Sequence, residues 1–249
     1  MADTAEMYLD LMKRVLINTI YRDEAIQEFD YGDGEEVEHR LVGRDWPSVA
    51  HTMIGLKRLD NLQRCVETVL RENVPGDLIE TGVWRGGASI FMRAVVRAHG
   101  DTGRTVWVAD SFQGMPEVAA SGHAADVAME LHKYNDVLAI SLDTVRYNFE
   151  RYGLLDDQVR FLPGWFADTL PTAPVERLAV LRLDGDLYES TTVALENLYP
   201  KLSPGGFTII DDYVIPACAE AVHHYRDAHG ITEPVVDIDG TAAYWRKTP

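Results

Sequence analysis

Apolar residues recur along the chain at two different spacings, and the change between them divides the sequence. Over residues 5–21 and again over 54–72 they return every three or four positions, which predicts two amphipathic helices. Between them, residues 22–47 are rich in Glu, Asp and Gly, so we expect a mobile loop or lid, or partial disorder. The pattern predicts an N-terminal helical cap and lid over residues 1–75.

From residue 76 onward, short apolar runs alternate with helical periodicity, which is the pattern of an α/β domain. Five runs predict buried parallel strands: 77–81, 104–110, 158–162, 178–184 and 206–211. Helices are expected over 87–99, 141–153, 190–201 and 216–229. Segment 112–136 has weak periodicity and contains the turn formers Gly114 and Pro116, so we interpret it as a long excursion from one edge of the sheet.

The C-terminal residues predict an antiparallel hairpin, because two strand-like runs, 234–239 and 242–247, flank the dipeptide Gly240-Thr241. Dinucleotide-binding sheets ordinarily continue in parallel, whereas this ending is typical of Rossmann-like class I methyltransferases. By this analogy we expect a mostly parallel seven-stranded sheet closed by the hairpin. The core would span residues 76–249, with the N-terminal cap and lid packed on it as one structural domain overall.

Composition excludes some functions. The formal net charge of the 249 residues is −17, and no Lys/Arg cluster offers the basic face that nucleic acids or anionic membranes require. Two cysteines, Cys65 and Cys218, lie far apart and form no metal-type pair. We find no signal peptide and no run of membrane-spanning length, so we expect a cytoplasmic protein.

Four aspartates carry the strongest chemical signal. Asp184 and Asp186 follow one predicted strand, and Asp211 and Asp212 follow another. Carboxyl ends of parallel strands meet at the edge where α/β enzymes keep their chemistry. Carboxylates converging there would repel one another unless a cation lay among them. The pair Asp211-Asp212 also suits a helix cap, and we favour the metal site because a second acidic pair accompanies it.

Three further segments suggest a nucleoside-containing cofactor. The first strand runs into Glu80-Thr81-Gly82 and a glycine-rich turn, where a helix N-terminus suits a carboxylate and Glu80 suits an ammonium group. Asp110, followed by Ser111 and Phe112, ends the second strand, where an acidic side chain binds ribose hydroxyls. Trp165 and Phe166 follow the third strand and suit either an adenine ring or the core.

Several of these motifs together resemble the macrocin O-methyltransferase (TylF-type) family. The resemblance covers about residues 7–247 and is carried by Val49-Ala-His-Thr-Met-Ile-Gly55, Glu80-Thr-Gly-Val-Trp-Arg-Gly-Gly87, Val108-Ala-Asp-Ser-Phe-Gln-Gly114, Tyr152-Gly-Leu-Leu-Asp-Asp157, Asp184-Gly-Asp186 and Ile210-Asp-Asp-Tyr213. It implies an S-adenosylmethionine- and Mg²⁺-dependent enzyme that methylates a sugar hydroxyl on a glycosylated natural product, as in antibiotic tailoring.

The resemblance also implies roles for individual residues. Asp184, Asp211 and Asp212 match the family's metal ligands, and Asp186 matches its general base. Cofactor-binding positions are expected at Thr52, Met53, Glu80, Thr81, Gly82, Asp110, Ser111, Phe112, Trp165, Phe166 and Asp184. His132, in the excursion, is a candidate auxiliary base beside Tyr134.

The partners expected are a small-molecule glycoside and further copies of this chain, because the helices over 5–21 and 54–72 carry apolar surface suited to self-association. The identity of the acceptor stays open. This sequence departs from the macrolide-modifying members in segment 23–46, at Trp46 and in the stretch Leu187-Tyr-Glu-Ser190. A metal-dependent catechol or phenol O-methyltransferase is one alternative. A non-catalytic cofactor-binding scaffold is another, although a scaffold has no need to concentrate like charges.

Overall fold

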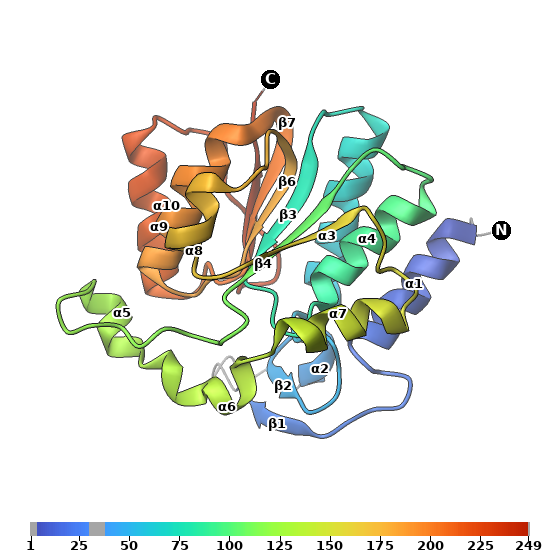
Figure 1. Cartoon of the computed structure of the whole chain (residues 1–249), viewed down its shortest axis with the longest axis horizontal. Helices are drawn as coiled ribbons and strands as arrows, with labels where there is room; N and C mark the ends of the chain where they lie inside the picture. Colours follow the sequence, from blue (N-terminus) through green and yellow to red (C-terminus); the bar gives the residue numbers. More distant parts are fainter. Residues whose placement is uncertain (1–3, 30–37, 249) are drawn as a thin grey trace.

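A seven-stranded sheet runs through the molecule in the order β5-β4-β3-β6-β7-β9-β8 (Figure 1). The computed structural model describes residues 4–29 and 38–248. The strands are β3 (Asp77–Thr81), β4 (Val106–Asp110), β5 (Val159–Pro163), β6 (Leu178–Leu183), β7 (Leu202–Ile210), β8 (Val236–Asp237) and β9 (Ala243–Arg246). The pairs among β3 to β7 are parallel, whereas β9 lies antiparallel between β7 and β8. The predicted α/β sheet and its C-terminal hairpin are confirmed.

Helices cover both faces of the sheet because the central strands are apolar on both sides. Leu78 and Val180 contribute to one core cluster, and their neighbours Ile79 and Leu181 to the other. The first cluster is closed by α1 (Thr4–Leu16), α3 (Gly55–Arg71), α4 (Gly87–Ala98) and α7 (Leu142–Arg151). The second is closed by α9 (Tyr188–Leu198) and α10 (Pro216–Ala228), with the short α8 (Phe166–Thr169) beside them (Figure 1).

Strand β7 begins four residues earlier than the apolar pattern predicts. The sequence Ser203-Pro-Gly-Gly206 reads as a turn, yet it lies within the strand. The pairing register with β6 shifts across this stretch, and Gly205 adopts a φ of +85°. A bulge of this kind lets Pro and Gly remain in a strand that they would otherwise interrupt.

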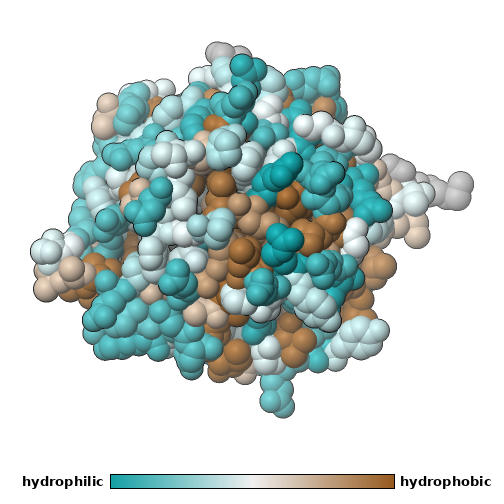
Figure 2. Space-filling model, in the orientation of Figure 1, coloured by the Kyte–Doolittle hydropathy of each residue, from teal (hydrophilic) through white to brown (hydrophobic). Residues whose placement is uncertain are grey.

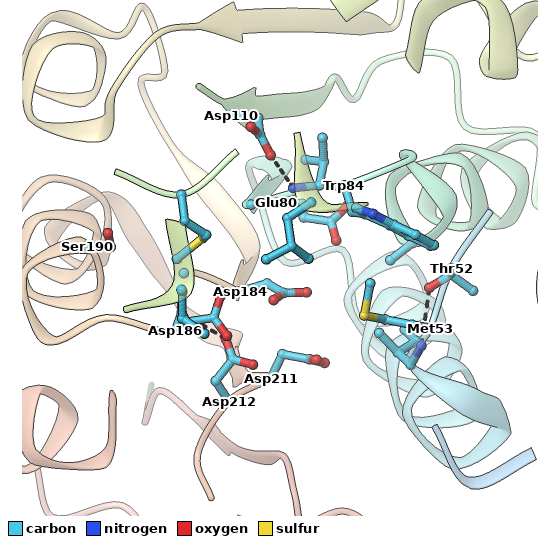
Figure 3. A pocket seen from close by; sticks show the side chains of 18 of the residues that line it. Thr52, Met53, Glu80, Trp84, Asp110, Asp184, Asp186, Ser190, Asp211 and Asp212 are labelled. Carbon is cyan, nitrogen blue, oxygen red and sulfur yellow. Dashed lines mark hydrogen bonds between the residues drawn. The ribbon is translucent and has the colours of Figure 1, made fainter. Parts of the chain in front are cut away.

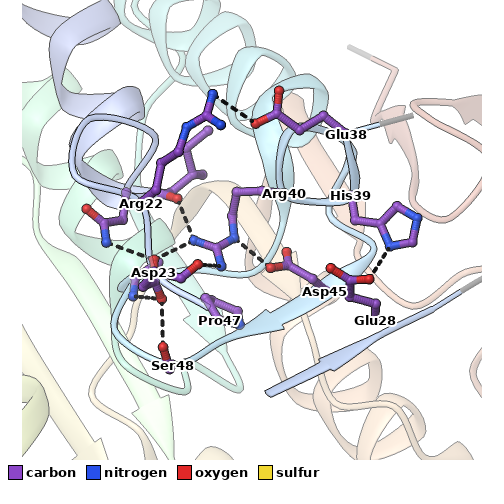
Figure 4. A network of polar contacts seen from close by, with 12 residues as sticks. Arg22, Asp23, Glu28, Glu38, His39, Arg40, Asp45, Pro47 and Ser48 are labelled. Atoms are coloured by element: carbon purple, nitrogen blue, oxygen red, sulfur yellow. Dashed lines mark hydrogen bonds and ion pairs between the residues drawn. The ribbon is translucent and has the colours of Figure 1, made fainter. Parts of the chain in front are cut away.

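The segment expected to be a loop or lid is partly regular. It contains β1 (Ala25–Glu28), α2 (His39–Val42) and β2 (Asp45–Pro47), with β1 and β2 paired antiparallel. Residues 30–37 lie outside the described part. In place of an apolar core, Arg40 donates to Asp23 (2.6 Å) and to Asp45 (2.7 Å), and the side chains of both acids are largely shielded from solvent (Figure 4). The loop prediction is therefore wrong for these elements, because ion pairs hold them without helical or alternating apolar spacing.

The long excursion after β4 is confirmed. It contains α5 (Ala124–Met129), a 3₁₀ turn at Leu131–Tyr134 and α6 (Asn135–Leu138), and it lies with β1 and β2 along one edge of the sheet (Figure 1). Asn135 closes the loop by accepting from the backbone N–H of Met115 (2.8 Å) and donating to its carbonyl (2.9 Å). This edge is the one where β3, β4, β6 and β7 end.

The apolar core crosses the expected boundary at residue 75. Leu9, Leu16 and Leu59 belong to the same cluster as Leu78: cap helix α3 packs on β6 and β7, and α1 packs on α4. Helix α1 exposes Met7 and Leu11, whereas no large apolar side chain of α3 is exposed. The apolar surface expected for self-association therefore remains on the first helix only. None of the helices within residues 4–29 and 38–248 combines the length and apolar character that a bilayer crossing requires.

Candidate functional site

A cavity of about 350 Å³ opens at the edge where β3, β4, β6 and β7 end. Its volume lies in the range of small-molecule sites. Twelve of the residues singled out from the sequence line it: Thr52, Met53, Glu80, Gly82, Asp110, Ser111, Trp165, Phe166, Asp184, Asp186, Asp211 and Asp212. Figure 3 shows many of these side chains converging from four strand ends and from the segment before α3. Figure 2 shows apolar side chains near the middle of the molecular face seen in Figure 1, among largely polar ones.

The turn after β3 is shaped by close backbone contacts. Gly82 has a φ of +82°, and a Cβ placed on it would lie 1.6 Å from the carbonyl oxygen of Asp184. Gly87, at the start of α4, donates its N–H to the carbonyl of His51 (2.9 Å), and a Cβ there would lie 2.3 Å from the same oxygen. Only glycine fits either position. The turn therefore places the N-terminus of α4 and its positive dipole end beside the cavity.

Asp110 lies at the end of β4, where its carboxylate accepts from the backbone N–H of Val83 (2.7 Å) and of Phe112 (2.7 Å). Burial raises its pKa against these hydrogen bonds. The carboxylate is thereby fixed across the β3 turn at the cavity wall (Figure 3). This is the place and residue type that suit a pair of ribose hydroxyls.

The segment that carries Thr52 and Met53 is held from two sides. Arg85, in the β3 turn, donates to the carbonyls of Pro47 (3.0 Å) and Ala50 (2.8 Å). Asp23 accepts from the backbone N–H groups of residues 49 (2.6 Å) and 50 (3.2 Å). The turn expected to hold the cofactor and the residues expected to cover it are therefore one connected unit.

Three carboxylates meet in the cavity. Asp184, Asp186 and Asp212 each offer one oxygen, and these oxygens lie within 4.8 Å of one another. The backbone N–H of Asp186 donates to Asp212 (3.0 Å; Figure 3). Burial and the neighbouring Asp211 raise the pKa of Asp184 to about 6, and burial with Asp184 raises the pKa of Asp186 to about 7. Burial, and after it the charges of Asp186 and Asp184, raise the pKa of Asp212 well above its ordinary value.

The raised pKa values mean that burial and mutual repulsion disfavour ionising all three carboxylates unless a cation accompanies them. Oxygen atoms at this spacing are the donor set that Mg²⁺ prefers. The residues therefore fit a divalent cation.

Asp211 differs from the other three aspartates because it already has cationic partners. It accepts from Arg58 (2.5 Å) and from Arg182 (2.5 Å), and all three residues are buried. Burial alone would raise the pKa of Asp211, but Arg182 and Arg58 hold it below its ordinary value. Asp186 therefore belongs to the carboxylate group in the structure, whereas Asp211 is a neighbour whose charge two arginines neutralise. This arrangement differs from the expected ligand set of Asp184, Asp211 and Asp212.

Arg182 is the residue that sequence reasoning missed. It is 1% exposed, lies inside strand β6 and also donates to Asp184 (2.9 Å) and to Glu80. A charged residue inside the apolar run Leu-Arg-Leu is a signal, since a buried cation requires carboxylate partners. Arg58 gave a weaker signal, because it lies on the inner side of α3 among apolar residues.

Glu80 is less available to a ligand than expected. One carboxylate oxygen accepts from Ser89 and the other from Arg182, and the side chain is 1% exposed. Burial raises its pKa to about 7, against the lowering effect of Arg182. The structure places Glu80 beneath the cofactor turn as the acid that compensates Arg182. A contact with a ligand ammonium group would have to use a second lone pair of an oxygen that is already bonded.

Three expected site residues do not line the cavity. Thr81 is 1% exposed within β3, and Phe112 packs in the apolar core against the ring of Phe161. His132 lies on the 3₁₀ turn after α5, where its neighbour Leu131 is the residue that reaches the cavity. Strand alternation explains Thr81, since successive side chains point to opposite faces. These positions therefore contribute no side chain to the site.

The acceptor side of the cavity was not anticipated in detail. Apolar side chains from the lid, the excursion and the segment after β7 line it: Phe29, Trp46, Met115, Pro116, Leu131, Leu138, Val214 and Ile215. Trp46 packs edge-to-face on Tyr134, with ring centroids 5.5 Å apart. The lid and the excursion therefore meet across the cavity, and their apolar wall suits a bulky organic acceptor.

Comparisons with known proteins identify relatives that match nearly the whole chain. The family model described as Macrocin-O-methyltransferase (TylF) matches residues 5–247. The chain is 71% identical over 246 residues to 8-demethyl-8-(2,3-dimethoxy-alpha-L-rhamnosyl)-tetracenomycin-C 4'-O-methyltransferase from Streptomyces olivaceus, covering 99% of this chain and 94% of that protein. It is 59% identical to mycinamicin III 3''-O-methyltransferase from Micromonospora griseorubida, covering 98% of this chain and 97% of that protein.

Solved structures give the same result. The O-methyltransferase NovP is 56% identical and superposes with a TM-score of 0.93, covering 98% of this chain and 100% of that one. The calicheamicin methyltransferase CalS11 has a TM-score of 0.54 at 21% identity, over 76% of this chain and 78% of that one. The latter likeness shows a shared fold alone. The class I methyltransferase fold expected from the C-terminal hairpin is confirmed.

Proposed function

Because the chain belongs to the macrocin O-methyltransferase family, we propose that it transfers a methyl group from S-adenosylmethionine to a deoxysugar hydroxyl of a glycosylated natural product, using Mg²⁺. The observation that carries the proposal is the meeting of Asp184, Asp186 and Asp212 in the cavity that also holds the Gly82 turn. A methyl donor and a deprotonated acceptor must occupy one space, and this cavity offers surfaces for both.

The donor half of the cavity is formed by the β3 turn and the end of β4. S-adenosylmethionine supplies an electrophilic methyl group when it is bound. Asp110 is proposed to accept hydrogen bonds from its ribose, and the positive N-terminal end of α4 is proposed to favour its carboxylate. Thr52 and Met53 cover the donor from the lid side. Trp165 and Phe166 lie at the wall, where they suit the adenine ring.

The acceptor half is formed by the carboxylates and the apolar wall. Mg²⁺ held by Asp184 and Asp212, with Asp186 beside it, would lower the pKa of an acceptor hydroxyl. A carboxylate beside the bound cation suits proton removal, and Asp186, whose oxygen lies next to those of Asp184 and Asp212, is proposed as the base. Asp211, neutralised by Arg58 and Arg182, keeps the charge balance beside the group. The protein orients the two reactants and excludes water, which accounts for much of the rate.

The test is methyl transfer measured by mass spectrometry with a panel of rhamnosylated and other deoxysugar acceptors, alongside a simple catechol. We expect a mass gain of one methyl group on glycosides and loss of turnover in Asp186→Asn. Turnover confined to the catechol would favour a phenol O-methyltransferase. Cofactor binding without turnover on any acceptor, unchanged in Asp186→Asn, would favour a non-catalytic scaffold.

Self-association is a further part of the proposal. Met7 and Leu11 are 63% and 53% exposed on α1 and lie one helical turn apart, which suits an apolar contact with a second copy. Light scattering coupled to size exclusion should give a mass above that of the 27.9 kDa chain. The double variant Met7→Glu, Leu11→Glu should then return the monomer mass.

A further inference from the structure

The excursion after β4 places one acid beneath the start of α9. Asp126, on α5, is 1% exposed, and its carboxylate accepts from the backbone N–H of Tyr188 (2.6 Å) and of Glu189 (3.0 Å). These are the first two residues of α9, and the helix has Leu187 at its N-cap, which offers no side-chain acceptor. A residue more than 60 positions earlier in the chain therefore satisfies the first N–H groups of this helix.

The helix that Asp126 caps begins directly after the turn that carries Asp186. The backbone N–H of Leu187 donates to the carbonyl of Gly185 (2.5 Å), which closes a three-residue turn around Asp186. Asp186 has a φ of +56° there, a conformation that residues with a side chain seldom adopt. Turns of this kind are rare and strained, and they persist where the surroundings hold them on more than one side.

Two contacts hold the turn from opposite ends. On one side, the backbone N–H of Asp186 donates to Asp212 (3.0 Å). On the other, Asp126 fixes residues 188 and 189, two and three positions further along the chain. The first contact lies within the carboxylate group, whereas the second comes from α5 in the excursion, whose residues Met115 and Leu131 line the cavity. Asp126 thus links the excursion to the chain directly after the Asp186 turn.

The docking of α5 is reinforced by a ring contact. The imidazole of His123 stacks on the ring of Tyr188 with centroids 3.8 Å apart and planes 6° apart, and the Tyr188 hydroxyl bonds His224 (3.0 Å). The same excursion carries Met115 and Leu131, which line the cavity. A displacement of α5 would therefore move the acceptor wall and the start of α9 together.

We infer that Asp126 is a positioning residue for methyl transfer, which sets the Asp186 turn through the N-terminus of α9 and so holds the Asp184, Asp186 and Asp212 oxygens at binding distance. The inference rests on the proposed function, because it assigns Asp126 an effect on the group proposed to bind the cation and take the proton. A plain helix cap would stabilise α9 without affecting the neighbouring carboxylates. Residues behind metal ligands typically change metal affinity or activity 10- to 100-fold when they are replaced.

The experiment compares Asp126→Ala and Asp126→Asn with the wild-type protein. We expect kcat to fall about 10- to 100-fold in Asp126→Ala, and Mn²⁺, measured by electron paramagnetic resonance without substrate, to bind about tenfold more weakly. The KM for S-adenosylmethionine should change less than about twofold, because the donor half lies on the β3 side. Asp126→Asn keeps one carbonyl oxygen that accepts from one N–H, so its losses of kcat and of Mn²⁺ affinity should be smaller than those of Asp126→Ala. It should also fold if Asp126→Ala does not.

The matched control is Asp101→Ala. Asp101 also accepts from two backbone N–H groups, those of Gly103 (2.9 Å) and Arg104 (3.0 Å), before β4 and away from the cavity. Its replacement should lower the melting temperature while kcat and Mn²⁺ affinity stay at the wild-type level. Wild-type kcat and Mn²⁺ affinity in both Asp126 variants, with only a lower melting temperature, would overturn the inference. If Asp186→Asn were fully active and bound Mn²⁺ normally, the proposed function would fail instead.

Discussion

Replacing Gly82 by Ala tests the close approach that joins the cofactor turn to the carboxylate group. The added Cβ would lie 1.6 Å from the carbonyl oxygen of Asp184, whereas real Cβ contacts stay above 3.0 Å, so the ends of β3 and β6 must separate by about 1.4 Å. The hydrogen bond from Asp184 N–H to the carbonyl of Thr81 (2.8 Å) joins the same two segments and would be stretched. The substitution therefore displaces Asp184, the first residue of the carboxylate group.

The magnitude follows from two costs. Holding a residue with a side chain in the left-handed region costs about 1–2 kcal/mol. Forcing packed segments apart costs about 1–3 kcal/mol more. We therefore expect the free energy of unfolding to fall by about 2–5 kcal/mol in Gly82→Ala. Since a displacement near 1 Å at a reacting centre costs about 100-fold in rate, kcat should fall by that order in the fraction that folds.

Urea titration measures the first effect, and methyl transfer well below the melting temperature measures the second. Gly100→Ala is the control, because Gly100 has a similar φ of +69° and nothing within 4 Å of its added Cβ. It should lose only the conformational cost of about 1–2 kcal/mol and retain full activity. Equal losses of stability in the two variants, with normal kcat in Gly82→Ala, would refute the contact and its role.

Two other predictions concern the acids beside the donor. Asp110→Asn should weaken S-adenosylmethionine binding about 10- to 100-fold in calorimetry with a much smaller effect on kcat, and the reverse pattern would contradict a ribose contact. Glu80 holds its proton more tightly in the folded state, with a pKa near 7 against an ordinary 4.5, so the wild-type free energy of unfolding should fall as pH rises through that window. Glu80→Gln removes the contribution of Glu80 to this pH dependence. In urea titrations with chelator present, the free energy of unfolding of the variant should therefore rise relative to that of the wild type from pH 4.5 to 7. A difference that stays constant over this range would contradict the raised pKa of Glu80.

The sheet could be predicted because its signal is local. Runs such as Leu78-Ile79 and Val180-Leu181 are apolar on both faces, and each ends in a polar residue where the strand ends. That pattern located Glu80, Asp110, Asp184 and Asp211 at one edge without knowledge of the pairing. The C-terminal hairpin was equally local, because a glycine turn separates its strands.

The arrangement of charges could not be predicted in the same way. Arg58 meets Asp211 across 153 positions, and Arg182 meets Glu80 across 102, so the partner of each acid depends on packing between distant elements. Sequence spacing treated Asp211 and Asp212 as equivalent neighbours. The side chains instead differ, because Asp211 accepts from two arginines while Asp212 joins Asp184 and Asp186.

Short ionic elements were missed for a related reason. The lid strands β1 and β2 are held by Arg40 between Asp23 and Asp45, a pattern with no apolar period. The role of Asp126 was likewise invisible, since α9 begins at a leucine cap and draws its acceptor from another segment. Both cases show polar groups satisfied by residues of another element, which periodicity does not record.

The most direct test of the account is the anomalous difference map, at the manganese edge, of crystals grown with Mn²⁺ and spent cofactor. We expect one strong peak among the oxygens of Asp184, Asp186 and Asp212, with Asp211 still bonded to Arg58 and Arg182. A map without a peak at that group under saturating Mn²⁺ would contradict the claim that these carboxylates gather to hold a cation for methyl transfer.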